Sequence, residues 1–147
     1  MPRLLRYFWT LPNTLLGLLL ALPALMTGGG VRLVSGVIEV HGGVLKLLLK
    51  RCIPIKGGAG AITFGHVVLG RDSGILDRTR PHERVHVRQY ERWGPLFIPA
   101  YLGASLVALW RGTGAYHGNR FERHARSAAP LSRSEPEEGT LKNAKMQ

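Results

Sequence analysis

A short polar run near the middle of the chain could carry out hydrolytic chemistry, because His82, Glu83 and His86 form a His-Glu-x-x-His pattern. On a helix, positions i and i+4 lie on one face, so both imidazoles can reach one metal ion. Glu83 follows the first histidine and can hold and deprotonate a water beside that metal, as a general base does. The pattern therefore predicts zinc-assisted hydrolysis, with Zn²⁺ as the cofactor and Glu83 as the catalytic base.

The residues around the pattern predict the helix that would position it. Thr79 can cap a helix start, and Pro81 is tolerated in a first helical turn. Residues 82–93 contain neither glycine nor proline, and Gly94 and Pro95 then end the segment. We expect a helix of about three turns over 82–93. The alternative is a polar surface helix on which two histidines merely align.

A catalytic zinc usually has three protein ligands and one open position, so a third ligand must come from elsewhere in the chain. The extended His-Glu-x-x-His-x-x-Gly-x-x-His form is excluded, because Gln89 and Arg92 occupy the positions of its glycine and third histidine. Glu91 would be rotated away from both histidines on the same helix, and Asp77 would lie just before the helix cap.

Glu122 is the better candidate for the third ligand, and Ala125 follows it after three residues. On residues 82–86 and 119–125 the chain resembles the gluzincin group of zinc metallopeptidases. In that group a glutamate from a second helix completes the site, and a small residue follows it at this spacing. The resemblance implies a minimal zincin-like fold with His82, His86 and Glu122 as metal ligands. The chain departs from thermolysin-like members by having Phe121, not asparagine, directly before the glutamate.

Four further polar residues are candidates for supporting roles. Gln89 lies three residues after the second histidine and could orient a metal ligand. The others could stabilise an oxyanion, donate a proton, compete as ligands or lie at the surface. They are Tyr116, His117 and His124. Glu122 itself could instead be an ordinary helix carboxylate paired with Arg120 or Arg126.

The segment before the pattern predicts a small antiparallel sheet. Residues 31–40 and 44–49 read as two strands around a turn at 41–43, and residues 61–70 read as a third. This third strand resembles the edge strand that small zincins place beside the active-site helix. With helices expected at 82–93, 95–110 and about 117–128, the fold class is α+β, a sheet packed beside site-bearing helices.

The N-terminus predicts a membrane helix. Residues 7–31 carry no charge, and residues 11–26 are apolar on every face. A spanning helix needs about 20 such residues. A cleaved signal peptide and a buried core helix are the alternatives. No clear cleavage site follows the apolar run, and a core helix of a soluble domain would be polar on one side.

A second apolar segment, residues 94–110, separates the histidines from Glu122. If it crossed a bilayer, the ligands would lie about 30 Å apart on opposite sides. We therefore expect it to lie in the interface or in the domain core. The bias of basic residues after the first helix favours a cytoplasmic catalytic domain at a membrane of the bacterial inner-membrane type.

The chain of 147 residues and net charge +11 is organised into three parts: a membrane helix (1–30), a zincin-like domain (31–129) and a disordered tail (130–147). No nucleic-acid-binding motif accompanies the basic charge, so membrane lipid is the expected partner. The expected function is a membrane-associated zinc metallopeptidase acting on a peptide or protein substrate. The alternatives are a non-enzymatic membrane protein with a structural zinc or no metal, and a basic peripheral protein that binds anionic lipid.

Overall fold

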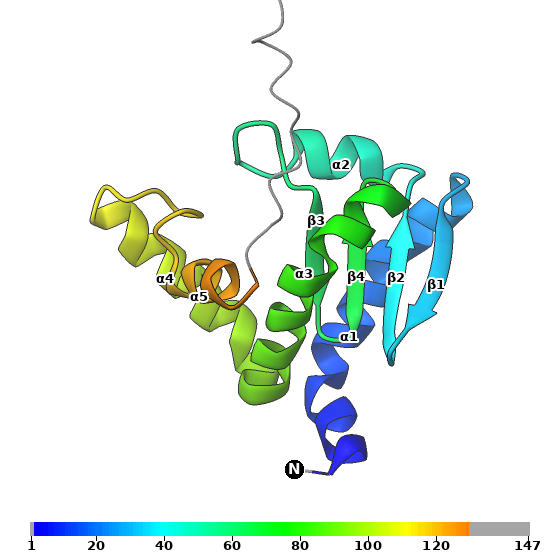
Figure 1. Ribbon diagram of the computed structural model, residues 1–147, viewed down its shortest axis with the longest axis horizontal. Coiled ribbons are helices and arrows are strands. Elements are labelled where there is room, and N and C mark those ends of the chain that lie inside the picture. The colour runs from blue at the N-terminus through cyan, green and yellow to red at the C-terminus, as the bar shows by residue number, and fades with distance from the viewer. Residues whose placement is uncertain (1, 130–147) are drawn as a thin grey trace, which may run out of the picture.

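A four-stranded mixed sheet lies between helices on both of its faces in the computed structural model, which describes residues 2–129 (Figure 1). The strands are β1 (Gly30–Val34), β2 (Val37–His41), β3 (Ala61–Phe64) and β4 (Val67–Gly70). Their order is β1-β2-β4-β3, with β1–β2 and β3–β4 antiparallel and β2–β4 parallel. The expected α+β class is confirmed, and the expectation of a purely antiparallel sheet is wrong at its central pair.

The predicted strand at 44–49 is instead a helix, α2 (Leu45–Arg51). Its leucines and lysines are good helix formers, and Leu45 and Leu49, four residues apart, are both buried against the sheet. The first hairpin therefore closes earlier, between β1 and β2. The predicted strand at 61–70 is also divided, because Gly65 adopts a φ of 60° and the chain turns there into β4.

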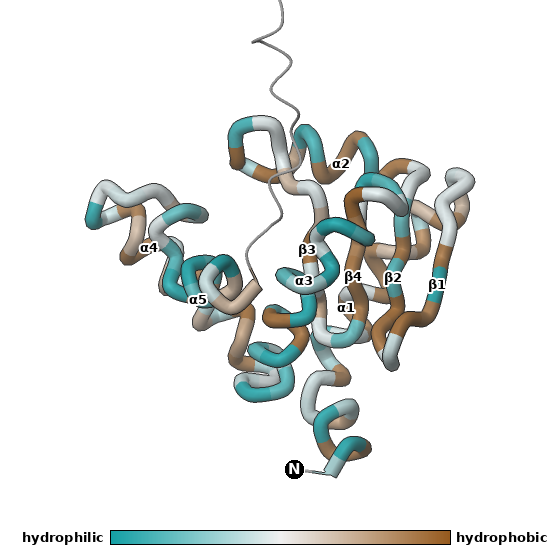
Figure 2. The backbone as a smooth tube through the Cα atoms, in the orientation of Figure 1, coloured by the Kyte–Doolittle hydropathy of each residue, from teal (hydrophilic) through white to brown (hydrophobic). Residues whose placement is uncertain are grey.

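Central strand β4 is buried on both faces, which explains its unbroken apolar sequence. Val67 and Leu69 pack with α1 (Arg3–Met26) and α2 on one face. Val68 packs with α3 (Ser73–Trp93) on the other face. Helices α1 and α3 therefore cover opposite sides of the sheet. Figure 2 shows hydrophilic stretches along α3 that are absent from the middle of β4.

Helix α3 begins at Ser73, earlier than predicted, because Asp72 caps it by accepting a hydrogen bond from the Ile75 amide at 2.8 Å. Thr79 is therefore an interior residue, and its hydroxyl donates to the Ile75 carbonyl at 2.9 Å. Pro81 also lies inside the helix. The predicted end is confirmed, because Gly94 takes a φ of 55° and stops α3.

Three further helical segments follow α3: a short 3₁₀ turn (Gly94–Leu96), α4 (Phe97–Trp110) and α5 (Arg120–Ala128). The apolar segment predicted to return the chain to the site is thus α4, and α5 packs beside α3 (Figure 1). The predicted disordered tail, residues 130–147, lies outside the described residues.

Two helical stretches, Arg3–Met26 and Ser73–Trp110, are long and apolar enough to cross a membrane by length and composition. The second combines α3, the 3₁₀ turn and α4. The orientation of the domain relative to a membrane stays a prediction, as does the division of the chain into three parts.

Candidate metal centre

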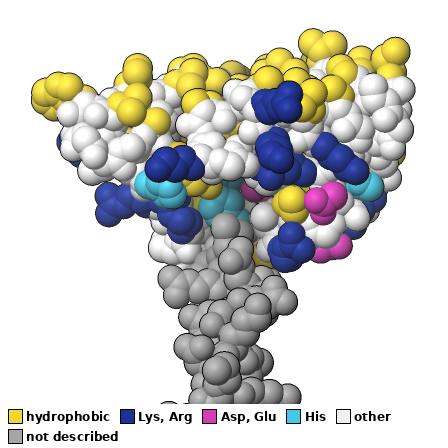
Figure 3. All heavy atoms as spheres, turned by 90° about the horizontal axis from the view of Figure 1, so that it is seen from above, with side chains coloured by type: hydrophobic (Ala, Val, Ile, Leu, Met, Phe, Trp, Pro, Cys, Tyr) yellow, Lys and Arg dark blue, Asp and Glu magenta, His cyan; other side chains and the backbone are white. Residues whose placement is uncertain are grey.

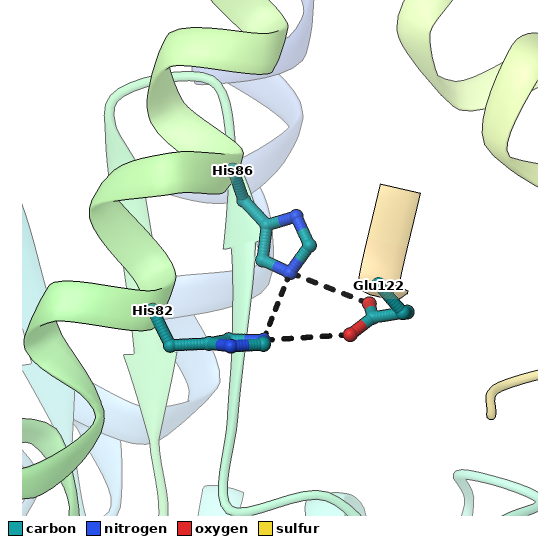
Figure 4. A group of neighbouring side chains, drawn as sticks. All are labelled: His82, His86 and Glu122. Atoms are coloured by element: carbon teal, nitrogen blue, oxygen red, sulfur yellow. Dashed lines mark hydrogen bonds and ion pairs between the residues drawn. The ribbon is translucent and has the colours of Figure 1, made fainter. Parts of the chain in front are cut away.

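Helices α3 and α5 bring three buried side chains together: His82, His86 and Glu122 (Figure 4). The two histidine Nε2 atoms lie 3.2 Å apart. Glu122 Oε2 is 3.4 Å from His82 Nε2, and Glu122 Oε1 is 3.3 Å from His86 Nε2. All three residues are at most 7% exposed. This group could hold a metal ion, and these are the three residues that the sequence analysis chose as ligands.

The start of α5 is fixed by Asn119, which places Glu122 one turn further on. The Asn119 side chain caps the helix by accepting a hydrogen bond from the Phe121 amide at 2.8 Å. Its Nδ2 donates to the Tyr101 carbonyl at 3.0 Å and to the Ser105 hydroxyl at 2.8 Å, both on α4. Fully buried Asn119 therefore ties α5 to α4, a role that its sequence position alone did not indicate.

Ala125, on the same helix, lies in a small apolar cluster with Val85 of α3 and Ala129. Its side chain is fully buried, and Val85 lies between the two histidines in sequence. A larger residue at 125 would push α5 away from α3, so the small side chain allows Glu122 to approach the two imidazoles.

Tyr101 of α4 donates its hydroxyl hydrogen to Glu122 Oε1 at 2.7 Å. Burial alone would raise the pKa of the Glu122 carboxyl, but the His82 and His86 imidazoles 3.3–3.4 Å away outweigh burial and hold that pKa well below its ordinary value. Burial would lower the pKa of His86, yet the Glu122 carboxylate, 3.3 Å from His86 Nε2, raises that pKa above 6.5. Glu122 is therefore an ionised carboxylate facing the two imidazoles.

Gln89 orients the second histidine from one turn further along α3. Its Oε1 lies 2.9 Å from His86 Nδ1, and its Nε2 donates to the Phe121 carbonyl at 3.1 Å. With the amide in this orientation, His86 Nδ1 is the donor and Nε2 presents a lone pair to the centre. His124 Nδ1 lies 3.1 Å from Gln89 Nε2, so His124 approaches the group only through Gln89.

Glu83, the predicted base, is 6% exposed and is held by the edge strand of the sheet. The Thr63 hydroxyl on β3 donates to Glu83 Oε2 at 2.6 Å. Sequence reasoning did not identify Thr63, because nothing in a four-residue strand indicates which side chain meets the helix. The contact links Glu83 to the edge of the sheet.

The remaining sequence candidates lie outside the three-residue group. His117 is exposed, and its ring packs edge-to-face on Tyr116. Burial and the nearby Glu122 carboxylate raise the pKa of Tyr116 above 10, so Tyr116 is a neutral hydroxyl close to the site. Asp77 pairs with Arg32 and Arg80, and Glu91 with His66 and Arg6.

Within the described residues, two buried atoms of the group, His82 Nδ1 and Glu122 Oε2, have no hydrogen-bond partner. A buried carboxylate oxygen without a hydrogen-bond donor is costly. A cation between Oε2 and the two Nε2 atoms would satisfy it. The donor set of two imidazoles and one carboxylate thus fits a divalent metal ion.

Comparison with protein-family models, with curated proteins and with solved structures finds no match for this chain. The interpretation of the site therefore depends on its geometry.

Proposed function

We propose that this protein is a membrane-associated zinc metallopeptidase, in which His82, His86 and Glu122 hold the metal. The spacing of the ligand atoms is the observation that supports it most. In a tetrahedral zinc site with bonds of about 2.0–2.1 Å, ligand atoms lie about 3.3 Å apart. Here the two imidazole Nε2 atoms lie 3.2 Å apart, and each lies 3.3 or 3.4 Å from a different carboxylate oxygen of Glu122.

A set of three protein ligands favours a catalytic site over a structural one. Structural zinc sites are closed by four protein ligands, whereas catalytic sites leave the fourth position to water. Among the described residues, His124 is separated from the group by Gln89 and His117 is exposed, so neither supplies a fourth ligand. Zinc bound there would lower the pKa of a water and polarise the scissile carbonyl.

Glu83 is the general base of the proposed reaction. The hydroxyl of Thr63 holds one of its carboxylate oxygens, Oε2, which leaves Oε1 to accept a proton from the attacking water. The same oxygen then delivers that proton to the leaving amine as the peptide bond breaks. The resemblance of residues 82–86 and 119–125 to gluzincins supports these roles.

An extended peptide is the substrate class that the surroundings of the site favour. Strand β3 forms an edge of the sheet and packs against α3, beside the base. An edge strand offers unpaired backbone N–H and C=O groups that an extended peptide can pair with.

Replacing Glu83 by glutamine tests the mechanism. Glu83→Gln removes the base without touching a metal ligand, so zinc content should stay at the wild-type level while hydrolysis of a quenched-fluorescent peptide library falls by about 10²-fold or more. Glu91→Gln is the matched control, since Glu91 lies on the same helix but pairs with Arg6 and His66. Hydrolysis unchanged in Glu83→Gln would contradict the proposal.

A further inference from the structure

We propose that the protein docks flat on an anionic membrane leaflet, with α1 and α4 lying in the plane of the interface and neither helix crossing the bilayer. This placement builds on the membrane association proposed above and is independent of the peptidase chemistry.

Helix α1 has its polarity reversed relative to a helix on the surface of a soluble domain. Its buried stripe consists of small and polar residues: Thr10, Asn13, Gly17, Ala21 and Ala24. Asn13 Nδ2 donates to the Gly94 carbonyl at 2.8 Å. The outward side is a row of exposed leucines, of which Leu15 is 55% and Leu19 63% exposed. Such a surface is stable against hydrocarbon and unfavourable in water.

The sheet accompanies α1 along its length, and this excludes a crossing orientation. Near the start of the helix, the Tyr7 hydroxyl donates to the Gly36 carbonyl at 3.0 Å. In the middle, a Cβ on Gly17 would lie 2.8 Å from Val67 Cβ, which shows how closely the helix backbone meets β4. Near the end, Ala21 and Ala24 of α1 lie in one buried cluster with Val40 of β2 and Leu69 of β4.

If α1 crossed the bilayer, the sheet would be carried into the hydrocarbon with it. Edge strands β1 and β3 would then expose unpaired backbone groups to lipid, which membrane proteins do not tolerate. Charged groups on the α3 side of the sheet, including the Arg32–Asp77 ion pair, would enter the bilayer too. With α1 parallel to the membrane, the edge-strand backbone groups and the charged groups both stay in water.

Two other elements extend the apolar face of α1. Val31 and Leu33 of β1 are 58% and 72% exposed, and their register partners Val40 and Ile38 belong to the core on the α1 side of the sheet. Helix α4 adds five exposed side chains: Leu102, Leu106, Val107, Leu109 and Trp110. Figure 3 shows hydrophobic side chains gathered along one edge of the molecule, with Lys and Arg side chains next to that edge and over the face beside it.

Basic residues near the ends of the helices indicate the headgroup chemistry. Helices α1 and α4 contain no aspartate or glutamate. Arg3 and Arg6 lie at the start of α1, Lys46 and Lys50 on α2, and Arg111 directly after α4, and all five are exposed. An apolar face flanked by cations matches the interfacial region of a leaflet rich in anionic phospholipid.

Vesicle flotation tests the docking face with the full-length protein. Wild type should float with vesicles of phosphatidylcholine and phosphatidylglycerol, and less with phosphatidylcholine alone. The double variant Leu15→Lys/Leu19→Lys should reduce partitioning by about tenfold or more, because both charges enter the apolar face. Ser73→Lys/Ser127→Lys adds the same charges at exposed positions outside that face and should float as wild type does.

Zinc content and circular dichroism in detergent show whether each variant is folded, so a folding defect is distinguished from lost docking. A wild-type protein that does not float and elutes as a dimer would overturn the proposal. So would a Leu15→Lys/Leu19→Lys variant that is folded and floats normally. Both outcomes leave the peptidase proposal standing, because hydrolysis of a water-soluble peptide is measured separately.

Cysteine labelling distinguishes an α1 that lies in the plane of the membrane from an α1 that crosses the bilayer. In a Cys52→Ser background, Arg3→Cys and Lys50→Cys place single thiols at the first residue of α1 and on α2, which follows it. A membrane-impermeant maleimide is applied to sealed membrane vesicles from expressing cells. Docking on one leaflet predicts that both positions react, or that both are protected until detergent is added. One position reacting while the other is protected would show a crossing and overturn the proposal.

Discussion

The Tyr101 hydroxyl donates a hydrogen bond to Glu122 Oε1 at 2.7 Å, so a residue of the apolar helix α4 holds one of the three side chains of the candidate metal centre. The neighbouring residue on α4, Leu102, is 57% exposed on the proposed docking face. Helix α4 thus joins the surface proposed to meet the membrane to the group that could bind the metal.

Removal of that hydroxyl should weaken metal binding without abolishing it. Tyr101→Phe leaves all three ligands in place but frees the Glu122 carboxylate to rotate, and loss of such outer contacts typically costs about 10–100-fold in metal affinity. A zinc competition assay with a chromophoric chelator measures the effect. Tyr7→Phe is the control, since the Tyr7 hydroxyl bonds to the Gly36 carbonyl far from the site. Equal affinities for the Tyr101→Phe variant and wild type would contradict this role.

Metal affinity should fall steeply in acid. Both imidazoles must be neutral to bind a metal, so protons compete with zinc for His82 and His86. In acid we expect about a tenfold loss of affinity per pH unit for each proton displaced. Isothermal titration with zinc between pH 5 and pH 8 measures the slope. A flat profile over this interval would mean that the metal does not bind through these histidines.

The buried Glu39 carboxylate should stabilise the fold at neutral pH and not in acid. Burial alone would raise its pKa, but hydrogen bonds from Arg80 and Arg32 outweigh burial and hold the pKa below 4.5. A carboxyl with a depressed folded-state pKa stabilises the protein above its unfolded pKa, and the contribution is lost as pH falls through the folded value.

Glu39→Gln should therefore lower the free energy of unfolding by about 2 kcal/mol at pH 7, and the difference from wild type should shrink towards zero near pH 3. Denaturant unfolding at both pH values measures it. Asp77→Asn is the control, because Asp77 contacts the same two arginines from an exposed position and should matter much less. A Glu39→Gln difference that persists in acid would contradict the assignment.

Gly17 should be intolerant of any side chain. A Cβ there would lie 2.8 Å from Val67 Cβ and 2.9 Å from Phe64 Cβ, so Gly17→Ala should force α1 off the sheet and cost about 1–3 kcal/mol. Gly103→Ala, in apolar helix α4, meets no atom within 4 Å and should be neutral or stabilising, because alanine favours helix. Thermal unfolding in detergent compares the two variants, and equal effects would refute the close-packing argument.

Local spacing predicted the pair of histidines, and the resemblance to gluzincins added Glu122. The four-residue interval between His82 and His86 determines that they share a helix face, and Ala125 indicated that a second helix could approach closely. The structure brings His82, His86 and Glu122 into one buried group, as the sequence predicts. The identity of the metal stays a prediction. Tyr101, Thr63 and Asn119 were missed, because their roles depend on contacts between elements that no local pattern encodes.

The errors in the fold have a similar cause. The apolar run at residues 44–49 predicts a strand, but a short apolar run does not distinguish strand from helix. The parallel pairing of β2 with β4 depends on the crossover through α2 and β3, and the sequence does not show which strands become neighbours. Asp72 was overlooked as a cap because Pro81 suggested a later helix start.

Titration of metal-free protein with zinc, followed by peptide hydrolysis, tests the central proposal most directly. If His82, His86 and Glu122 form a catalytic zinc site, hydrolysis should rise linearly with added zinc and level off at one zinc per chain, and His86→Ala should abolish both binding and hydrolysis. Hydrolysis that persists without zinc, or full occupancy at one zinc per chain without hydrolysis, would contradict it.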